Sequence, residues 1–232
     1  RVRIGLLLLG LGLAAIASAD TRSPGAGSAP PPTASVPAGQ GPGTWWLVGA
    51  LTGSTKPDDH LADYQWDTSA QLAYGARLLM GRGPLAVGVG TWRSNTTQST
   101  GFAGAGTNPT VNATSWEVMG EGRLLTVWGL DLLASASAGR MHLGYDPEQM
   151  TIDPGTGTPV VVDFEAVDEW IGGGGLGARH PVGSNWALGL SVEHRWYGLD
   201  TAHRNGSVIV QQRESFGEWS ARFEMAWIHA SR

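Results

Sequence analysis

Arginine and glutamate residues that recur at even spacing are the groups in this sequence with the clearest capacity for chemistry. Glu193 and Arg195 are two residues apart, and so are Arg222 and Glu224. Residues two apart on a β-strand point to the same face, where opposite charges can pair or line a path for ions. The set therefore predicts either a network of ion pairs or an ion path. Its members are Arg77, Glu117, Glu121, Arg123, Glu169, Arg179, Glu193, Arg195, Arg222 and Glu224.

A histidine next to a carboxylate offers a second kind of chemistry, the activation of a hydroxyl nucleophile. Such catalysis brings a serine, a histidine and an acid together. His194 is followed by Arg195 and Trp196, and the Ser94-Asn95 pair has no histidine before it. Neither stretch contains a complete motif, so we expect no catalytic residues and no enzyme.

Acidic residues gather around positions 58–63 and 146–168. Carboxylate oxygens are ligands that Ca²⁺ and Mg²⁺ prefer. No spacing among these residues matches a defined ligand set, so we expect a solvated acidic rim and assign no metal site.

A glycine-rich run at 172–177 formally contains the G-x-G-x-x-G pattern of dinucleotide sites. That chemistry needs the pattern to follow a strand and open a helix. Here the run lies inside an expected strand and leads into Ala178-Arg179-His180-Pro181. We expect no cofactor, and interpret the glycines as allowing close strand approach or making room for bulky side chains of the next strand.

Eight strands are expected to position these residues, because apolar and polar residues alternate along each stretch. In the last stretch, Trp219, Ala221, Phe223, Met225 and Trp227 alternate with polar residues. Tight connections are expected at 81–83, 129 and 183–184, and long polar ones at 53–63, 93–111, 144–162 and 199–216. The expected strands are 44–52, 64–80, 85–91, 112–128, 130–143, 164–179, 185–199 and 218–227.

Tryptophans mark both ends of these strands. Where two share a strand, as in 116/128, 186/196 and 219/227, their separation is even, so that both are expected on one face. An apolar face with aromatic ends and a charged reverse face is the pattern of a strand that crosses a membrane. The expected girdle residues are Trp45, Trp46, Trp128, Trp186 and Trp227 at the short-turn end, and Trp66, Trp92, Trp116, Trp170, Trp196 and Trp219 at the long-loop end.

Composition divides the chain into three parts. Residues 1–19 have a basic start, an apolar stretch and a small-residue site, which predicts a signal peptide. Residues 20–43 are rich in Pro, Gly, Ala and Ser and are expected to be a disordered periplasmic segment. Residues 44–232 form the expected barrel. Cysteine is absent and the formal net charge is −5, which argues against disulfides and nucleic-acid binding.

Residues 44–228 resemble the small eight-stranded outer-membrane barrels, the OmpA-like transmembrane-domain group. The resemblance implies an all-β fold: an eight-stranded antiparallel up-and-down transmembrane β-barrel with short periplasmic turns and long external loops. It also implies a monomer in the bacterial outer membrane, in contact with membrane lipid, lipopolysaccharide and the barrel-assembly machinery. Such barrels usually end on an aromatic residue. Here five residues follow Trp227, so either Trp227 takes that part or the assembly signal is weak.

The function expected from these residues is that of a structural barrel that anchors surface loops, with its lumen plugged by Arg/Glu pairs. An eight-stranded barrel is just wide enough for side chains, and buried charges must be paired. We expect Arg222 and Glu224 to face Glu193 and Arg195 across the last strand pair. Three alternatives stay open: a narrow ion or small-solute channel, a lipid A-modifying outer-membrane enzyme, and a soluble ligand-binding barrel with its apolar face inward.

Overall fold

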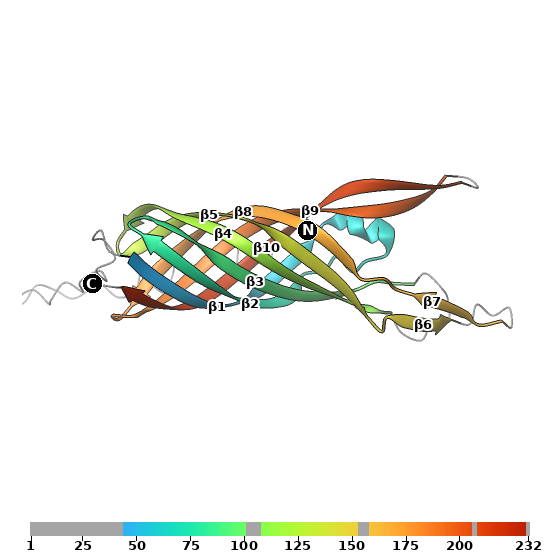
Figure 1. The fold of residues 1–232 in the computed structure, drawn as a ribbon, viewed down its shortest axis with the longest axis horizontal. Helices are drawn as coiled ribbons and strands as arrows, with labels where there is room; N and C mark the ends of the chain where they lie inside the picture. The colour runs from blue at the N-terminus through green and yellow to red at the C-terminus, as the bar shows by residue number, and fades with distance from the viewer. Residues whose placement is uncertain (1–43, 101–107, 153–157, 206–207, 231–232) are drawn as a thin grey trace, which may run out of the picture. The chain divides into compact units, whose positions relative to one another are not determined.

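The computed structural model describes residues 44–100, 108–152, 158–205 and 208–230. Eight antiparallel strands form a closed barrel in the order β1-β10-β9-β8-β5-β4-β3-β2 (Figure 1), which confirms the predicted fold class. The barrel strands are β1 (Thr44–Pro57), β2 (Gln71–Arg82), β3 (Leu85–Thr97), β4 (Thr110–Val127), β5 (Leu130–Asp146), β8 (Val167–Val182), β9 (Trp186–Asn205) and β10 (Val208–Ala230). The 3-10 helix η1 (Asp59–Tyr64) and the hairpin of β6 (Gln149–Ile152) and β7 (Val160–Asp163) lie outside this ring of strands.

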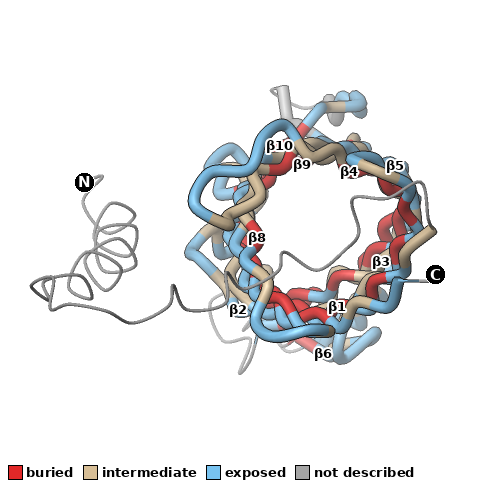
Figure 2. The backbone as a smooth tube through the Cα atoms, turned by 90° about the vertical axis from the view of Figure 1, so that its left-hand side faces the viewer, coloured by how far each residue is buried: buried red, intermediate tan, exposed pale blue. Residues whose placement is uncertain are grey.

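Strand register fixes the width and tilt of the barrel. The row of paired residues that starts at Trp219 on β10 returns to β10 at His229, a displacement of 229 − 219 = 10 residues. With strands about 4.8 Å apart and about 3.3 Å per residue, this displacement gives a tilt of about 40° and a radius of about 8 Å. Each residue then rises about 2.5 Å along the barrel axis. Figure 2, which looks along the barrel, shows the strands as a closed ring.

The connections at one end of the barrel are tight, as predicted. The turn between β4 and β5 consists of Trp128 and Gly129, with φ of 53° and 77°. Two positive φ values suit the primed turns that match the twist of a hairpin. Gly83 and Gly183 also have positive φ, 60° and 76°, in the other two short turns.

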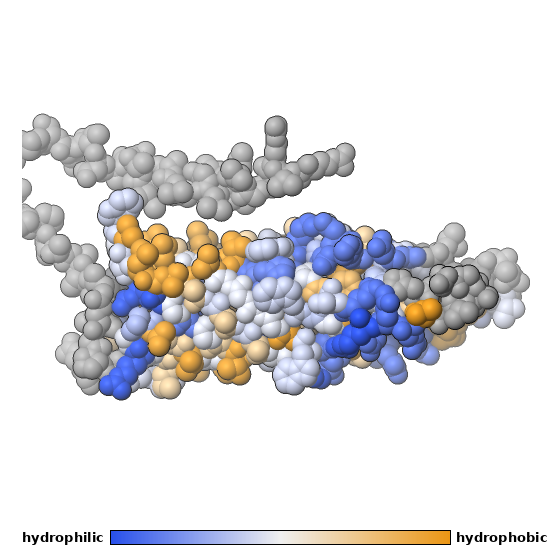
Figure 3. Space-filling view, turned by 90° about the horizontal axis from the view of Figure 1, so that it is seen from above, coloured by the Kyte–Doolittle hydropathy of each residue, from blue (hydrophilic) through white to orange (hydrophobic). Residues whose placement is uncertain are grey.

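The two faces of the wall differ in the way that the alternation predicted. Large apolar side chains point outward, among them Val118 and Leu190, which are 67% and 64% exposed. In the space-filling view, apolar residues gather toward the short-turn end and hydrophilic residues toward the long-loop end (Figure 3). No helix among the described residues is long and apolar enough to cross a membrane.

Several expected boundaries are wrong at the long-loop end. The second strand begins at Gln71 rather than at residue 64, because residues 59–64 form η1. The stretch 144–162 is not a plain loop, since it contains the paired strands β6 and β7. The stretch 199–216 is not a loop either, because β9 and β10 continue to pair as far as Asn205 and Val208 (Figure 1). The signal peptide and the Pro-rich segment, residues 1–43, lie outside the described residues.

Candidate functional site

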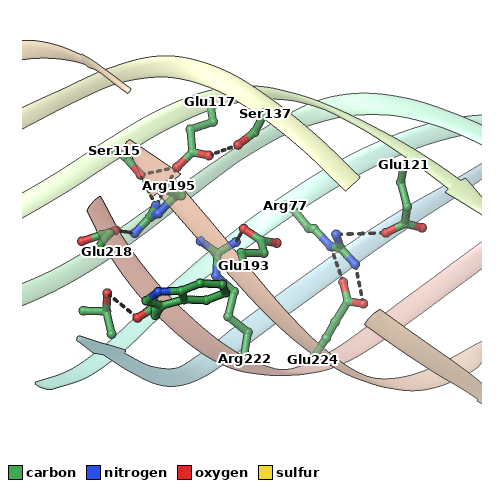
Figure 4. A network of polar contacts seen from close by, with 12 residues as sticks. Arg77, Ser115, Glu117, Glu121, Ser137, Glu193, Arg195, Glu218, Arg222 and Glu224 are labelled. Carbon is green, nitrogen blue, oxygen red and sulfur yellow. Dashed lines mark hydrogen bonds and ion pairs between the residues drawn. The ribbon is translucent and has the colours of Figure 1, made fainter. Parts of the chain in front are cut away.

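Four charged side chains from four strands meet across the lumen in the half nearer the short turns. Arg77 on β2 donates from Nε and Nη2 to Glu224 on β10, at 2.6 and 2.7 Å (Figure 4). Its Nη1 lies 3.1 Å from Glu121 on β4. Arg179 on β8 closes the ring with a bidentate contact to Glu121, at 2.7 and 2.8 Å, and lies 3.4 Å from Glu224. These four residues, the lower charge ring, carry two positive and two negative charges and are together neutral.

A second group of charges lies one layer toward the long-loop end. Arg195 on β9 contacts Glu117 on β4 at 2.8 Å and also pairs closely with Glu218 on β10 (Figure 4). The Glu117 carboxylate accepts two further hydrogen bonds, from the hydroxyls of Ser115 and Ser137, both at 2.6 Å. A buried carboxylate with three donors retains its charge without solvent, because each donor replaces a lost water contact.

Arg222 completes this second layer. Its Nη1 lies 2.6 Å from Glu193, and its guanidinium carbon lies 4.3 Å above the centre of the Trp92 ring. Its Nε and Nη2 have no hydrogen-bond partner among the described residues. The face of the Trp92 indole attracts the guanidinium through a cation–π contact, in the place where a second carboxylate could have stood. We call Glu117, Glu193, Arg195, Glu218 and Arg222 the upper charge cluster.

The placement of the ten predicted lumen charges is uneven. Eight of them form the lower charge ring or belong to the upper charge cluster. Glu169 instead pairs with Arg213, which lies on β10 toward the long-loop end. Arg123 lies near the short turns, 3.7 Å from Asp131, and is not part of either group.

Across the last strand pair, Arg222 meets Glu193 as expected, whereas Glu224 turns to Arg77 and Arg179. The prediction omitted Glu218, although the alternation of the last strand placed it on the same face as Arg222 and Glu224.

The glycine run on β8 makes room for the upper charge cluster. A Cβ added at Gly173 would lie 2.6 Å from Cγ of Arg195, and one at Gly175 would lie 2.5 Å from Cγ of Glu193. Both distances are shorter than any tolerated carbon–carbon contact. The absence of a side chain at these glycines therefore leaves the space that Arg195 and Glu193 of the neighbouring strand occupy.

Apolar side chains fill the lumen at the short-turn end. Leu47, Leu79 and Ala226 are fully buried and pack with Ala86. The Trp45 indole packs against this group and donates from Nε1 to the Gly83 carbonyl at 3.3 Å. This layer separates the lower charge ring from the open end of the barrel.

The long-loop end is covered by η1, which the sequence did not predict. Leu61 at its centre is 1% exposed and belongs to a buried apolar cluster, the upper apolar layer. The members of that layer are Leu61, Val111, Met141, Leu143, Ile171, Tyr197, Leu199 and Phe216. Tyr64 at the end of η1 donates its hydroxyl to Glu214 on β10 at 2.6 Å. The first external connection is therefore folded back onto the barrel.

Asp58 fastens η1 at its start. Its carboxylate accepts the backbone N–H of His60 and that of Gly217 on β10, both at 3.1 Å. Burial opposes ionisation of the Asp58 carboxylate, but these two N–H donors, together with the electrostatic attraction of His60 and Lys56, outweigh it and lower its pKa. The ionised form of Asp58 is therefore the one that holds η1 to the wall.

Little space is left between the layers. A cavity of about 20 Å³ lies beside the lower charge ring, lined by Arg77, Glu121, Glu193 and Glu224 among others. A volume of this size admits about one water molecule.

Eight of the eleven tryptophans lie on the outside, where the girdle was expected: Trp46, Trp116, Trp128, Trp170, Trp186, Trp196, Trp219 and Trp227. The other three expectations are wrong. Trp45 follows the inward alternation of Leu47, and Trp92 is 3% exposed beneath Arg222. Trp66 precedes β2 and packs against the upper apolar layer. Trp128 belongs to a turn, and the pairing register shifts between Arg123 and Leu125. The even spacing of Trp116 and Trp128 therefore does not by itself place both side chains on one face.

Two histidines on the outer face bear on the enzyme alternative. The His194 ring lies between those of Trp196 and Trp219, with centroids 4.7 and 4.5 Å away. His142 contacts Asp168 at 3.0 Å through Nδ1. In the described part of the chain, no hydroxyl is hydrogen-bonded to either histidine, so neither forms a nucleophile–base–acid arrangement. No group of three or more His, Asp or Glu residues within the described ranges is placed to hold a metal ion.

No protein-family model matches the sequence, and no curated protein matches it. Solved structures with a similar fold include Neisserial surface protein A (9% identity, 79% of this chain and 96% of that chain, TM-score 0.49). Outer membrane protein AlkL matches at 14% identity, over 90% and 97% of the two chains, with a TM-score of 0.47. A major outer membrane protein from Thermus thermophilus matches at 13% identity, over 80% and 99%, with a TM-score of 0.45. The assignment of this chain to the eight-stranded barrels is made from its own strand pairing, in which β1 closes the sheet by pairing with both β2 and β10.

Proposed function

We propose that this protein is a structural barrel of the bacterial outer membrane that presents external β-structure at the cell surface and whose lumen is closed by paired charges. The observation that carries the proposal is the lower charge ring, in which two arginines and two glutamates span the lumen with contacts of 2.6 to 3.4 Å. A selective pore would favour a surplus of one sign and a continuous water path.

Two further features support a closed lumen. Apolar layers lie on both sides of the charged ones, beneath η1 at one end and around Leu47 at the other. Buried apolar layers oppose ion passage because an ion would lose its hydration there without gaining a partner.

The outer face supports a membrane location. From the tilt and register, the outward tryptophans at the short-turn end (Trp46, Trp186) and those at the long-loop end (Trp196, Trp219) lie about 25 Å apart along the axis. This is the height of the apolar band of outer-membrane barrels. A soluble ligand-binding barrel would turn its large apolar residues inward, whereas here Val118 and Leu190 point outward.

The strands at the long-loop end extend beyond the length needed to cross a membrane, and this excess is the structure that the barrel would present at the surface. β9 and β10 have 20 and 23 residues, about twice the 9–11 needed to cross the hydrocarbon. Beyond the tryptophans of the long-loop end, the remaining residues of β9 and β10 continue as a paired hairpin. The β6–β7 hairpin forms a second extension at the same end (Figure 1). A surface role therefore rests on rigid strands rather than on plain loops.

Planar-bilayer recording tests the closed lumen, after a heat-modifiability gel on membrane fractions has established the folded barrel. We expect a folded protein that inserts and passes no steady single-channel current. A reproducible open-channel current from the parent protein would overturn the plug and favour the channel alternative. A folded protein found only in the soluble fraction would overturn the membrane role itself.

A further inference from the structure

Two arginines on the outside of the barrel lie level with the tryptophans of the long-loop girdle. Arg140 on β5 pairs in register with Trp116 on β4 and Trp170 on β8. Arg93 on β3 is paired one row further out, opposite Thr114 on β4. With the tilt and rise derived above, Arg93, Arg140, Trp116 and Trp170 lie within about 6 Å of one height.

These arginines differ from those of the lumen in having no carboxylate partner. Arg140 lies 5.0 Å over the Trp170 ring, and its Nη2 reaches only the Asp168 backbone carbonyl, at 3.5 Å. Within the described residues, neither Arg93 nor Arg140 has a carboxylate at ion-pair distance, and both are exposed. The Asp168 carboxylate, which lies nearby, is in contact with His142 at 3.0 Å.

The position of the two arginines along the barrel axis indicates which part of the membrane they contact. Aromatic belts lie at the level of lipid headgroups, and exposed arginine is the side chain best suited to phosphate because its planar fork can donate two parallel hydrogen bonds. Arg93 and Arg140 lie two strands and two residues apart, about 12 Å, with Trp116 between them on β4. Such a spacing suits a headgroup that carries more than one phosphate.

We propose that Arg93 and Arg140, with Trp116 between them, form a binding site for the phosphate groups of an anionic lipid of the outer leaflet. We call these three residues the outer basic patch. The Trp116 indole packs against the lipid beneath the headgroup, and the two arginines fix the phosphates from either side. The proposal rests on the proposed membrane location and adds to it a ligand class and named residues.

Lipid titration of the purified full chain in a neutral detergent, followed by native mass spectrometry, tests the site. The probes are diphosphoryl lipid A, monophosphoryl lipid A, phosphatidylcholine and inorganic phosphate. We expect diphosphoryl lipid A to bind most tightly. R93Q and R140Q should each weaken it about 5-fold and the double variant about 30-fold, since each basic residue at a charged lipid surface contributes about 1 kcal/mol. R82Q, which removes an exposed arginine at the opposite end of the barrel wall, is the matched control and should leave the affinity unchanged.

The outcomes separate this inference from the proposed function. Unchanged lipid A affinity in the double variant, or an equal loss in R82Q, would overturn the outer basic patch. Equal displacement of the lipid by millimolar inorganic phosphate would show a phosphate site without lipid selectivity and would also overturn it. Insertion into phosphatidylcholine vesicles, which carry no net charge, is measured alongside. Failure of the parent to insert there would contradict the membrane location rather than the patch.

Discussion

Removal of Arg179 tests the lower charge ring most directly, because this side chain holds two carboxylates from strands on opposite sides of the lumen. In Arg179→Met, Glu121 keeps a single ion-pair partner, Arg77 at 3.1 Å, and Glu224 must share that same guanidinium. Two buried carboxylates then face one cation. Loss of one partner from a buried ion pair costs about 3–5 kcal/mol, chiefly because the remaining charge is left without compensation. We expect the free energy of unfolding to fall by that amount.

A second substitution shows whether charge, rather than packing, is responsible. In Arg179→Met with Glu121→Gln, the ring returns to one cation and one anion, with Arg77 still bonded to Glu224 at 2.6 and 2.7 Å. The double variant should therefore recover at least about half of the lost stability. Lys56→Met is the control. Its side chain is 49% exposed and that of its partner Asp59 is 78% exposed, so removing this surface pair should cost only about 0–1 kcal/mol.

Urea unfolding of the barrel in lipid vesicles, followed by tryptophan fluorescence, measures the parent, the three variants above and Glu121→Gln alone under one set of conditions. Similar losses for the Arg179 and Lys56 variants would refute the idea that the lumen charges are shielded from water at this level. Strict additivity of the Arg179 and Glu121 substitutions would do the same, since a water-filled channel would screen the two charges from each other.

Three further predictions concern the wall and the cover of the barrel. Leu190→Arg on the outer face should cost about 2–4 kcal/mol in the same titration, and Ser191→Ala on the inner face should cost little; equal effects would show that the facing is wrong. Leu61→Ala should destabilise the barrel by about 2–5 kcal/mol and speed hydrogen exchange of η1 in particular; exchange unchanged in η1 would mean that this leucine does not secure it. Because the pKa of Asp58 is lowered in the folded protein, its contribution is present above about pH 4 and is lost as the pH falls through the lowered value. The protection factor of the Gly217 N–H, which is its intrinsic exchange rate divided by the observed one, should therefore fall in acid in the parent and be low at all pH values in Asp58→Ala. A parent whose protection factor is insensitive to acid would contradict the role of this carboxylate.

The barrel could be predicted from the sequence because alternation and turn residues act locally. The period-two pattern of the last strand, with Trp219 and Trp227 on its apolar face, depends only on that strand. Gly83, Gly129 and Gly183 likewise marked turns whose positive φ is favoured by glycine. Strand existence and the short-turn end therefore followed from neighbouring residues alone.

The cover of the barrel could not be predicted in the same way. The stretch that forms η1 is polar and short, and only its packing against strands far away in the sequence buries Leu61. The inward position of Trp92 escaped prediction because the alternation of its strand is poor. The partners of the lumen charges depend on the 10-residue displacement around the barrel, which no single strand encodes.

Cross-lumen pairing has a consequence for the way the chain enters a membrane. Arg77 and Glu224 are 147 residues apart in the sequence, Arg179 and Glu121 are 58 apart, and Arg195 and Glu117 are 78 apart. No hairpin of adjacent strands contains both members of any of these pairs, so each hairpin alone would bring unneutralised charge into hydrocarbon. Arg77 and Glu224 can pair only when β2 and β10 are brought together through β1, which ties insertion to closure and disfavours half-inserted states. The same contacts that fill the finished barrel thus favour insertion and closure in a single step.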